Sequence, residues 1–391
     1  MRLMLVSIVP PHNDCGVRIV MHRHLVERAP FELHVASNAD FADGLFIHTK
    51  IELPFLFQKI KKSRFGPALR KWILDFENFL WPWIGSRQLE NAVRDFQPHV
   101  ILTLAETGLC HIAHATARKH GIPLAGLFLD WFPIMKSHFG HKWTQSLLTR
   151  RYRKLYSQCD LAFCTSDGMQ EVLGPHPNSH VVYPISGMKP VPNPECKTAG
   201  KKFRIAYVGS ALGFYGRMLQ SLIKPFQQIQ DLQLTIVGPN SDWPVEILSN
   251  AENSGICLGA KPPEEAAKFL SEADALLVVM SFEKQHELFM RTSFTTKFLD
   301  YSAFGKPVIL WGPDYCTPSK LAKREEAAFV VETESPEGVI AAAKKLIDEP
   351  AEVERLSAAS RRLNLTVFNP DRLQGIFVGE IEKLAKRSCD N

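Results

Sequence analysis

Short apolar runs alternate with amphipathic segments along the whole chain. Apolar runs of roughly four to eight residues are typical of strands that are buried on both faces of a parallel sheet. Between them, apolar residues spaced three and four apart predict helices that cover the sheet. The expected strands are residues 3–9, 32–36, 98–104, 123–129, 160–165 and 179–183, followed by 203–208, 232–237, 274–280, 308–311 and 327–332. The pattern therefore predicts an α/β protein with two successive doubly wound halves.

The chain has 391 residues, a length that favours two domains. Residues 187–202, GMKPVPNPECKTAGKK, contain three prolines and fit no regular element, as expected of a linker between domains. We therefore expect a first domain over residues 1–187, a linker over 188–202 and a second domain over 203–370. A final amphipathic helix is expected over residues 371–391.

The stretch over residues 293–311, SFTTKFLDYSAFGKPVILW, predicts a short helix that leads directly into a buried strand. Thr295 and Thr296 can cap the helix, Gly305 fits the position after its end, and Pro307 prevents its continuation. Lys297 lies in the first turn, where a cation opposes the helix dipole unless an anion binds there. A diphosphate would satisfy this arrangement. The alternative is that Thr295 only caps the helix and Lys297 is solvated.

The same stretch resembles the C-terminal signature of family 4-type glycosyltransferases, S-x-x-[ST]-K-x-x-[DE]-Y-x-A-x-G-K-P-V. The resemblance implies a GT-B fold, in which two Rossmann-like domains face each other across a cleft and a C-terminal helix crosses back to the first domain. It also implies a retaining, metal-independent enzyme that uses a nucleotide sugar. The family commonly has two glutamates here, and this chain has Thr292 and Asp300 at those positions.

Candidate site residues follow from this resemblance and from strand ends. A strand followed by three glycines and a helix, as after residue 208, is typical of a phosphate cradle, but it is not a P-loop. Asp130 ends a parallel strand, where doubly wound sheets bind ligands. The predicted catalytic residues are Asp130 and Lys297. The predicted nucleotide- and donor-binding residues are Gly16, Gly209, Ser210, Gly213, Arg217, Ser293, Thr295, Thr296, Lys297 and Asp300.

Besides Thr292, three further positions depart from the family pattern in ways that affect these assignments. Leu129 replaces the family's histidine beside Asp130, a contact that His138 or His141 could supply. Ser210 and Tyr215 stand where the family usually has an arginine and a lysine, and Arg217 could replace one of these charges. Because these family residues are missing, a non-catalytic protein that binds a nucleotide sugar or a partner remains an alternative.

Residues 53–86 combine basic and aromatic side chains at close spacing. Basic charge interleaved with Trp and Phe is typical of a membrane interface. The simpler interpretation is two helices whose aromatic residues pack in the core while the lysines face water. The residues concerned are Lys59, Lys61, Lys62, Arg64, Arg70 and Lys71 with Phe55, Phe57, Phe65, Trp72, Phe76, Phe79, Trp81 and Trp83.

Composition narrows the function classes. The net charge of +5 argues against a dedicated nucleic-acid binder but permits an anionic ligand or membrane surface. The eight scattered cysteines form no C-x-x-C pair, which indicates reduced thiols in the cytoplasm. The apolar N-terminus is short and meets two prolines, so it predicts a strand and not a signal peptide. No D-x-D occurs, and neither a metal nor a cofactor is expected.

We therefore expect a cytoplasmic hexosyltransferase-type glycosyltransferase, with peripheral contact to the inner face of the membrane through residues 53–86 as an option. Its donor would be a nucleotide sugar, and its acceptor a glycan, a lipid-linked molecule or a small molecule, as in the synthesis of cell envelope polysaccharide. The alternatives are a nucleotide-sugar 2-epimerase, which shares the fold, and a non-catalytic nucleotide-sugar-binding homologue.

Overall fold

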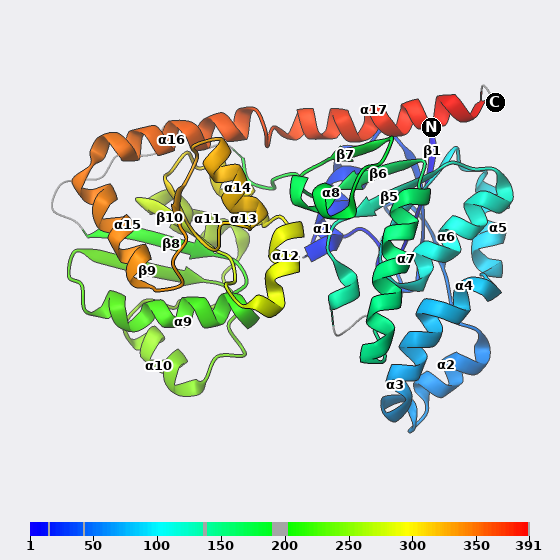
Figure 1. Cartoon of the computed structure of the whole chain (residues 1–391), viewed down its shortest axis with the longest axis horizontal. Helices are drawn as coiled ribbons and strands as arrows, with labels where there is room; N and C mark the ends of the chain where they lie inside the picture. The colour runs from blue at the N-terminus through cyan, green and yellow to red at the C-terminus, as the bar shows by residue number, and fades with distance from the viewer. Residues whose placement is uncertain (15, 42–43, 136–138, 190–201, 390–391) are drawn as a thin grey trace. The chain divides into compact units, whose positions relative to one another are not determined.

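The computed structural model describes residues 1–14, 16–41, 44–135, 139–189 and 202–389. The chain divides into two compact units, one of residues 1–185 and 371–391 and the other of residues 186–370. Each unit contains a parallel β-sheet with helices packed against it (Figure 1). Most of the linker expected over residues 188–202 lies outside the described residues.

The first unit is built on a seven-stranded sheet in the order β3-β2-β1-β4-β5-β6-β7, with every neighbouring pair parallel. The sequence pattern did not predict β3, because it is a short edge strand without an apolar run. The strands are β1 Arg2–Ser7, β2 Glu32–Ser37, β3 Ile47–Lys50, β4 Val100–Leu104, β5 Leu124–Phe128, β6 Leu161–Cys164 and β7 Ser179–Val181.

Helices cover both faces of this sheet. On one face Leu3 of β1 lies in a core cluster with Phe377 of α17 (Pro370–Cys389). Met4 points to the opposite face, because successive strand residues alternate, and it is fully buried there. The other helical segments are α1 Gly16–His22, η1 Arg23–Glu27, α2 Phe55–Lys62, α3 Gly66–Asp75, η2 Phe76–Leu80, α4 Trp81–Ile84, α5 Arg87–Phe96, α6 Thr107–His120, η3 Phe132–Ile134, η4 Lys142–Thr144, α7 Gln145–Gln158 and α8 Asp167–Leu173.

Polar contacts also fix α17 to the first unit. The side chains of Gln374 and His24 are hydrogen-bonded at 2.9 Å, and Gln374 Nε2 donates to the His24 carbonyl, also at 2.9 Å. Burial at this contact lowers the pKa of His24 to about 4, because the imidazolium would lose its water. Arg28 and Asp371 form an ion pair at 2.9 Å. The last helix is therefore a structural part of the N-terminal unit.

The second unit has a five-stranded parallel sheet in the order β12-β11-β10-β8-β9. Its strands are β8 Phe203–Val208, β9 Leu232–Val237, β10 Ala275–Val279, β11 Val308–Trp311 and β12 Phe329–Val331. Its helical segments are α9 Gly213–Gln227, α10 Val245–Asn253, α11 Pro263–Glu272, η5 Lys284–His286, α12 Glu287–Thr292, α13 Thr296–Ser302, α14 Thr317–Arg324, α15 Glu337–Asp348 and α16 Pro350–Leu365. Because all strands run the same way, their carboxyl ends meet at one edge, where such sheets bind ligands.

Candidate functional site

The helix α13 is tied to the end of β8, although some ninety residues of chain separate them. The Tyr301 hydroxyl accepts a hydrogen bond from the Val208 amide at 2.8 Å and donates one to the Val208 carbonyl at 3.0 Å. The helix ends at Ser302, and Gly305 lies three residues later, with φ +56, in the turn that leads to β11, so the prediction that Gly305 directly follows the helix end is wrong. Thr295 occupies the N-cap position, but its side chain makes no capping hydrogen bond. The predicted helix is therefore confirmed, and tertiary contacts hold it in place.

Lys297, one turn before Tyr301, extends across the loop that follows β8. A Cβ on Gly209 would lie 2.5 Å from Lys297 Cε and would displace the lysine side chain, and the φ of +136 at this position itself favours glycine. The ammonium lies 4.4 Å from the centre of the Tyr215 ring and 5.3 Å from that of Tyr207. Two tyrosine rings and the Gly209 backbone thus surround the cation.

This environment leaves the charge of Lys297 poorly compensated. Among the described residues, Lys297 has no ion-pair partner within 4 Å and no hydrogen bond. Desolvation lowers the pKa of Lys297 to about 8, and the charge of Asp300 opposes this shift only in part. An anion bound against the ammonium would restore the missing compensation, so the site is suited to a phosphate group.

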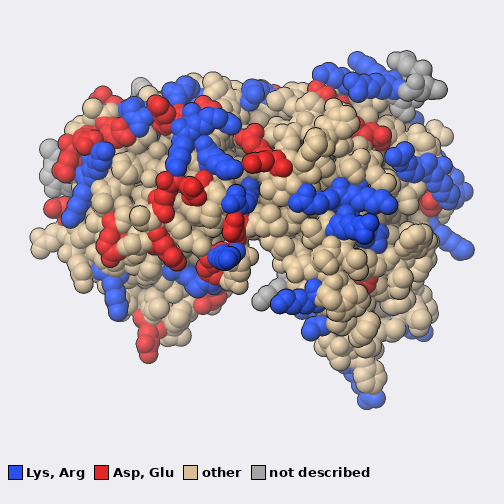
Figure 2. Space-filling model, in the orientation of Figure 1, with Lys and Arg blue, Asp and Glu red and all other residues tan. Residues whose placement is uncertain are grey.

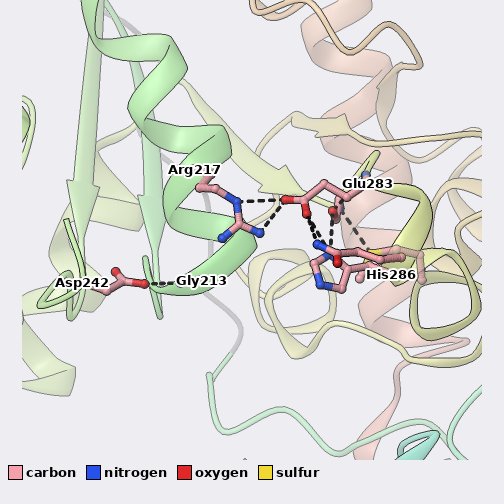
Figure 3. Close-up of polar contacts among 8 residues, drawn as sticks. Gly213, Arg217, Asp242, Glu283 and His286 are labelled. Atoms are coloured by element: carbon pink, nitrogen blue, oxygen red, sulfur yellow. Dashed lines mark hydrogen bonds and ion pairs between the residues drawn. The ribbon is translucent and has the colours of Figure 1, made fainter. Parts of the chain in front are cut away.

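The glycine-rich loop reaches from Gly209 to the start of α9, and its first helical amide already has an anionic partner. Gly213 has φ +60, and its N–H donates to Asp242 Oδ2 at 2.7 Å (Figure 3). A carboxylate thus occupies one of the positions that the predicted phosphate cradle would use. Ser210 contributes its carbonyl to the Tyr207 hydroxyl at 2.5 Å.

Arg217, which was predicted as a replacement cation, lies in α9 and forms an ion pair with a carboxylate outside this helix. Its Nε lies 2.9 Å from Glu283 Oε1, so the guanidinium has a carboxylate partner (Figure 3). The Arg217 contact lowers the pKa of Glu283. Glu283 also lies 3.7 Å from His286 Nδ1. Of the cations named for the nucleotide, Lys297 is therefore the one without an ion pair among the described residues.

The remaining predicted residues of this unit lie in and before α13. Ser293 and Thr295 are buried, and Thr296 is half-buried. Asp300 Oδ1 accepts a hydrogen bond from Ser186 Oγ at 2.8 Å. Thr292, at the position of the family's first glutamate, is fully buried and donates to the Leu288 carbonyl at 2.8 Å.

In the first unit, two carboxylates follow neighbouring strands. Asp130 comes after β5, and Glu106 comes after β4, which pairs with β5. Glu106 is only 8% exposed, and neither a hydrogen bond nor an ion pair from a described residue neutralises its side chain. Burial, with repulsion from Asp130, raises the pKa of Glu106 to about 7. Thr107 adopts φ +57, a strained conformation for a threonine, directly beside this carboxyl group.

The sequence prediction missed Glu106, although the rule that selected Asp130 applies to both. Two histidines, His138 and His141, were proposed to replace the family's histidine beside Asp130. His141 Nδ1 lies 2.5 Å from Asp75 Oδ2, and His138 lies outside the described residues. Gly16 begins α1 with φ +55, and open space surrounds its Cβ position.

The comparison with solved structures decides the fold. HepE of Anabaena in complex with UDP is similar with a TM-score of 0.66 and 11% identity, over 98% of this chain and 100% of HepE. Sucrose-phosphate synthase from Thermosynechococcus elongatus is similar with a TM-score of 0.63 and 12% identity, over 98% of both chains. The chain has the GT-B fold.

The chain was also compared with protein-family models, with a further solved structure and with the curated proteins. Residues 202–349 match the family model of group 1 glycosyl transferases. The lipopolysaccharide outer core galactosyltransferase WaaB, in its apo form, has a TM-score of 0.59 and 14% identity over 98% of this chain and 99% of WaaB. None of the curated proteins matches the sequence. The matched range contains Gly209, Lys297 and Asp300, so the sequence-level match lies in the second unit.

No group of three or more His, Cys, Asp or Glu side chains suited to a metal ion occurs in the part of the chain that the structure describes. Within the same part, no helix is both long and apolar enough to cross a membrane. Five cysteines of this GT-B chain are free and buried: Cys110, Cys159, Cys164, Cys257 and Cys316.

Proposed function

We propose that this protein is a glycosyltransferase that moves a sugar from a nucleotide-sugar donor to an acceptor. The family match over residues 202–349 and the GT-B fold support this function. The observation that carries it is Lys297, a desolvated cation without an ion pair among the described residues, held over the Gly209 loop. The donor diphosphate would bind here, against the second unit.

Stabilisation of the leaving group is the main electrostatic task of this reaction. The bond between the sugar and the diphosphate breaks, and negative charge develops on the departing oxygen. Lys297 would stabilise this charge, together with backbone N–H groups of the glycine-rich loop. If the Gly213 amide also contacts the phosphate, its hydrogen bond to Asp242 would have to break. We further propose, by resemblance to family 4-type enzymes, that a hexose is transferred with retention of configuration.

Activity is expected to survive EDTA. A lysine can supply the positive charge that a metal supplies in enzymes with a bridged diphosphate, and the sequence has no D-x-D. The measurement is the transfer or hydrolysis rate before and after chelation, with a magnesium-dependent transferase as a control. Complete loss with EDTA, restored by Mg²⁺ or Mn²⁺, would contradict metal independence.

Asp300→Asn is expected to weaken nucleotide binding more than Asp300→Glu does. Asp300 follows Lys297 by one turn and is proposed to accept hydrogen bonds from the ribose hydroxyls. An ionised acceptor forms hydrogen bonds of roughly twice the neutral strength, and glutamate keeps the charge. Calorimetry with the free nucleotide measures the difference. Ser186→Ala is the control, because it removes one hydrogen-bond partner of Asp300 without changing charge. Equal affinity for wild type and Asp300→Asn would leave Asp300 a structural role only.

On the acceptor side, we propose that the acceptor hydroxyl group attacks from the face that the diphosphate leaves, as retention requires, and that Glu106 takes the proton of this hydroxyl group. We propose that Asp130 helps to bind the sugar. A carboxyl group whose pKa is about 7 is half ionised near neutral pH, which suits a general base. Both residues follow strands at the edge where doubly wound sheets bind ligands.

The acceptor is proposed to be lipid-linked, as in the synthesis of cell envelope polysaccharide. Over residues 53–86 the tryptophans divide between core and surface: Trp81 is 2% exposed, whereas Trp72 and Trp83 are 61% and 87% exposed. Simple core packing is therefore wrong for Trp72 and Trp83 and right for Trp81. We call the exposed set the α2–α4 surface. Its apolar members are Phe55, Leu56, Phe65, Leu69, Trp72, Leu80, Trp83 and Ile84, and its basic members are Lys59, Lys61, Lys62, Arg64, Arg70 and Lys71.

The α2–α4 surface has the chemistry of a membrane interface. Exposed tryptophan suits the boundary between headgroups and acyl chains, and lysines and arginines attract anionic lipids. Figure 2 shows that the part of this unit containing α2, α3 and α4 is mostly uncharged, with basic side chains at its margin. We propose reversible docking at the cytoplasmic face of the membrane, a compartment that the free, buried cysteines support.

Replacing Trp72 and Trp83 together by alanine is expected to weaken vesicle binding at high salt by about tenfold or more. Burying one large apolar side chain contributes about 1.5–3 kcal/mol, and this part resists salt. Val245→Ala with Leu365→Ala is the matched control, since both residues are exposed and lie in the other unit. Co-sedimentation at low and high salt gives the affinities. Unchanged binding by the tryptophan variant would exclude this surface as the anchor.

A panel of nucleotide sugars tests the proposed function. Slow release of free nucleotide supports a transferase, because water then replaces the missing acceptor. Interconversion of the sugar would instead indicate an epimerase, and binding without turnover a non-catalytic protein. Both of these outcomes would contradict the proposal.

A further inference from the structure

A basic groove lies beside the α2–α4 surface, between α4, α6 and α7. Its volume is about 440 Å³, within the range of small-ligand sites. Trp83 lines one side, His111 and His114 come from α6, and Arg151 and Lys154 come from α7. Basic side chains cluster on the face of this unit that carries α7 (Figure 2). Trp83 belongs to both the groove and the exposed surface, so the two features are continuous.

The positive charge of this groove is not neutralised by described residues. Neither Arg151 nor Lys154 has an ion-pair partner among them. Arg151 is held in place by its NH1 group, which donates to the Phe79 carbonyl at 3.4 Å, and by its position 5.5 Å from the Phe79 ring centre. Asp160 acts on His114 through its charge, but its Oδ2 already accepts a hydrogen bond from the Leu124 amide at 2.8 Å.

The two histidines add neutral hydrogen-bonding groups. Burial, together with the charges of Arg151 and Lys154, lowers the pKa of His111 to about 3, and the pKa of His114 is lowered too, mainly by burial. Both rings are therefore neutral near pH 7, and each carries one N–H group. His114 Nε2 is buried and has no hydrogen-bond partner among the described residues. A ligand with several acceptor oxygens would satisfy these groups.

We propose that the groove binds the phosphomonoester headgroup of an anionic membrane lipid. A phosphomonoester carries close to two negative charges and three strong acceptor oxygens, which match one guanidinium, one ammonium and the imidazole N–H groups. Charge complementarity and the shared Trp83 select a lipid over a soluble phosphate, because Trp83 would insert beside the headgroup that the groove holds. The inference rests on the proposed membrane docking, but not on sugar transfer.

The test compares two kinds of anionic vesicle. Phosphatidylcholine vesicles contain either phosphatidate or a fatty acid, adjusted to the same surface potential, so that only the phosphomonoester differs. Wild type is expected to bind phosphatidate vesicles about tenfold more tightly or better, the factor for one charge-assisted hydrogen bond. Arg151→Gln with Lys154→Gln is expected to bring this ratio close to one.

Two further variants keep the test decisive. Lys142→Gln with Arg150→Gln removes the same charge from exposed positions of the same unit that do not line the groove. This variant is expected to weaken binding to both kinds of vesicle and to leave the ratio unchanged. Lys154→Glu keeps the Arg151 contacts with Phe79 and serves if the double variant fails to fold, with the same loss of ratio expected. A wild-type ratio near one, or an unchanged ratio in both groove variants, would overturn the headgroup site alone. No binding of wild type to any vesicle would overturn membrane docking as well, and neither result depends on turnover.

Discussion

Replacing Lys297 by alanine is expected to reduce kcat by about a hundredfold to a thousandfold, the effect typical of removing one preorganised group from a developing negative charge. In the structure the ammonium lies over Gly209 between two tyrosine rings, and no described residue forms an ion pair with it. The fold is expected to persist, because burial opposes the charge in the native state and Tyr301 independently ties α13 to β8. Rates with saturating donor, together with thermal unfolding, measure both effects.

The pH dependence of this variant provides a control. Diphosphate binding favours the charged lysine, so wild-type affinity is expected to fall as pH rises through about 8, and the alanine variant is expected to lose that step. Folding has the opposite dependence. Because the folded-state pKa of Lys297 lies below its usual value of 10.5, the unfolded chain binds more protons between the two values, and stability rises with pH there. Near wild-type rate and affinity in Lys297→Ala would contradict the diphosphate assignment.

Glu106→Gln is expected to lower kcat by about a hundredfold or more, the usual effect of losing a general base. The amide keeps the shape of the side chain but cannot accept the proton. Wild-type kcat is expected to rise with pH to a plateau above about 7, as Glu106 ionises, and the variant is expected to lack this step. The measurement is a pH–rate profile with the donor and acceptor at saturation.

Stability separates this role from a structural one. Because the pKa of Glu106 is raised above its usual 4.5 in the folded state, the native protein binds more protons than the unfolded chain between about 4.5 and 7. Stability conferred by the protonated form is therefore lost as pH rises through this window. Glu106→Gln should remove that loss and unfold at a higher temperature than wild type at alkaline pH. A variant with full activity would leave Glu106 without a catalytic role, whatever its stability.

The sequence was sufficient for the strands of both sheets apart from β3, and for the position of Lys297 in the first turn of a helix. Buried parallel strands appear in the sequence as apolar runs. The polar edge strand β3 was not predicted, because it has no such run. A cation in the first turn of a helix indicated an anion site, and the fold places it against Gly209. The contacts of Asp242 with Gly213 and of Glu283 with Arg217 could not be predicted, because they depend on how distant loops pack.

Burial was the other quantity that the sequence did not provide. The position of Glu106 after a strand is visible in the sequence, but its raised pKa results from the packing around it. For the tryptophans, helical geometry gives a partial answer. Trp81 and Trp83 are two residues apart and so about 200° apart around a helix, which favours one buried and one exposed ring. Which of them is exposed depends on the neighbouring α6, which contacts α4.

The most direct test of the central claim is a calorimetric titration of wild type and Lys297→Ala with UDP, GDP, ADP and dTDP at neutral pH. The account predicts that wild type binds at least one of these diphosphates, and that Lys297→Ala binds it about tenfold or more weakly, as for the loss of one charge-assisted hydrogen bond. Lys297→Arg, which retains the charge, should lie between them. Equal affinity of wild type and Lys297→Ala, or no binding of any diphosphate by wild type, would contradict a nucleotide site at Lys297.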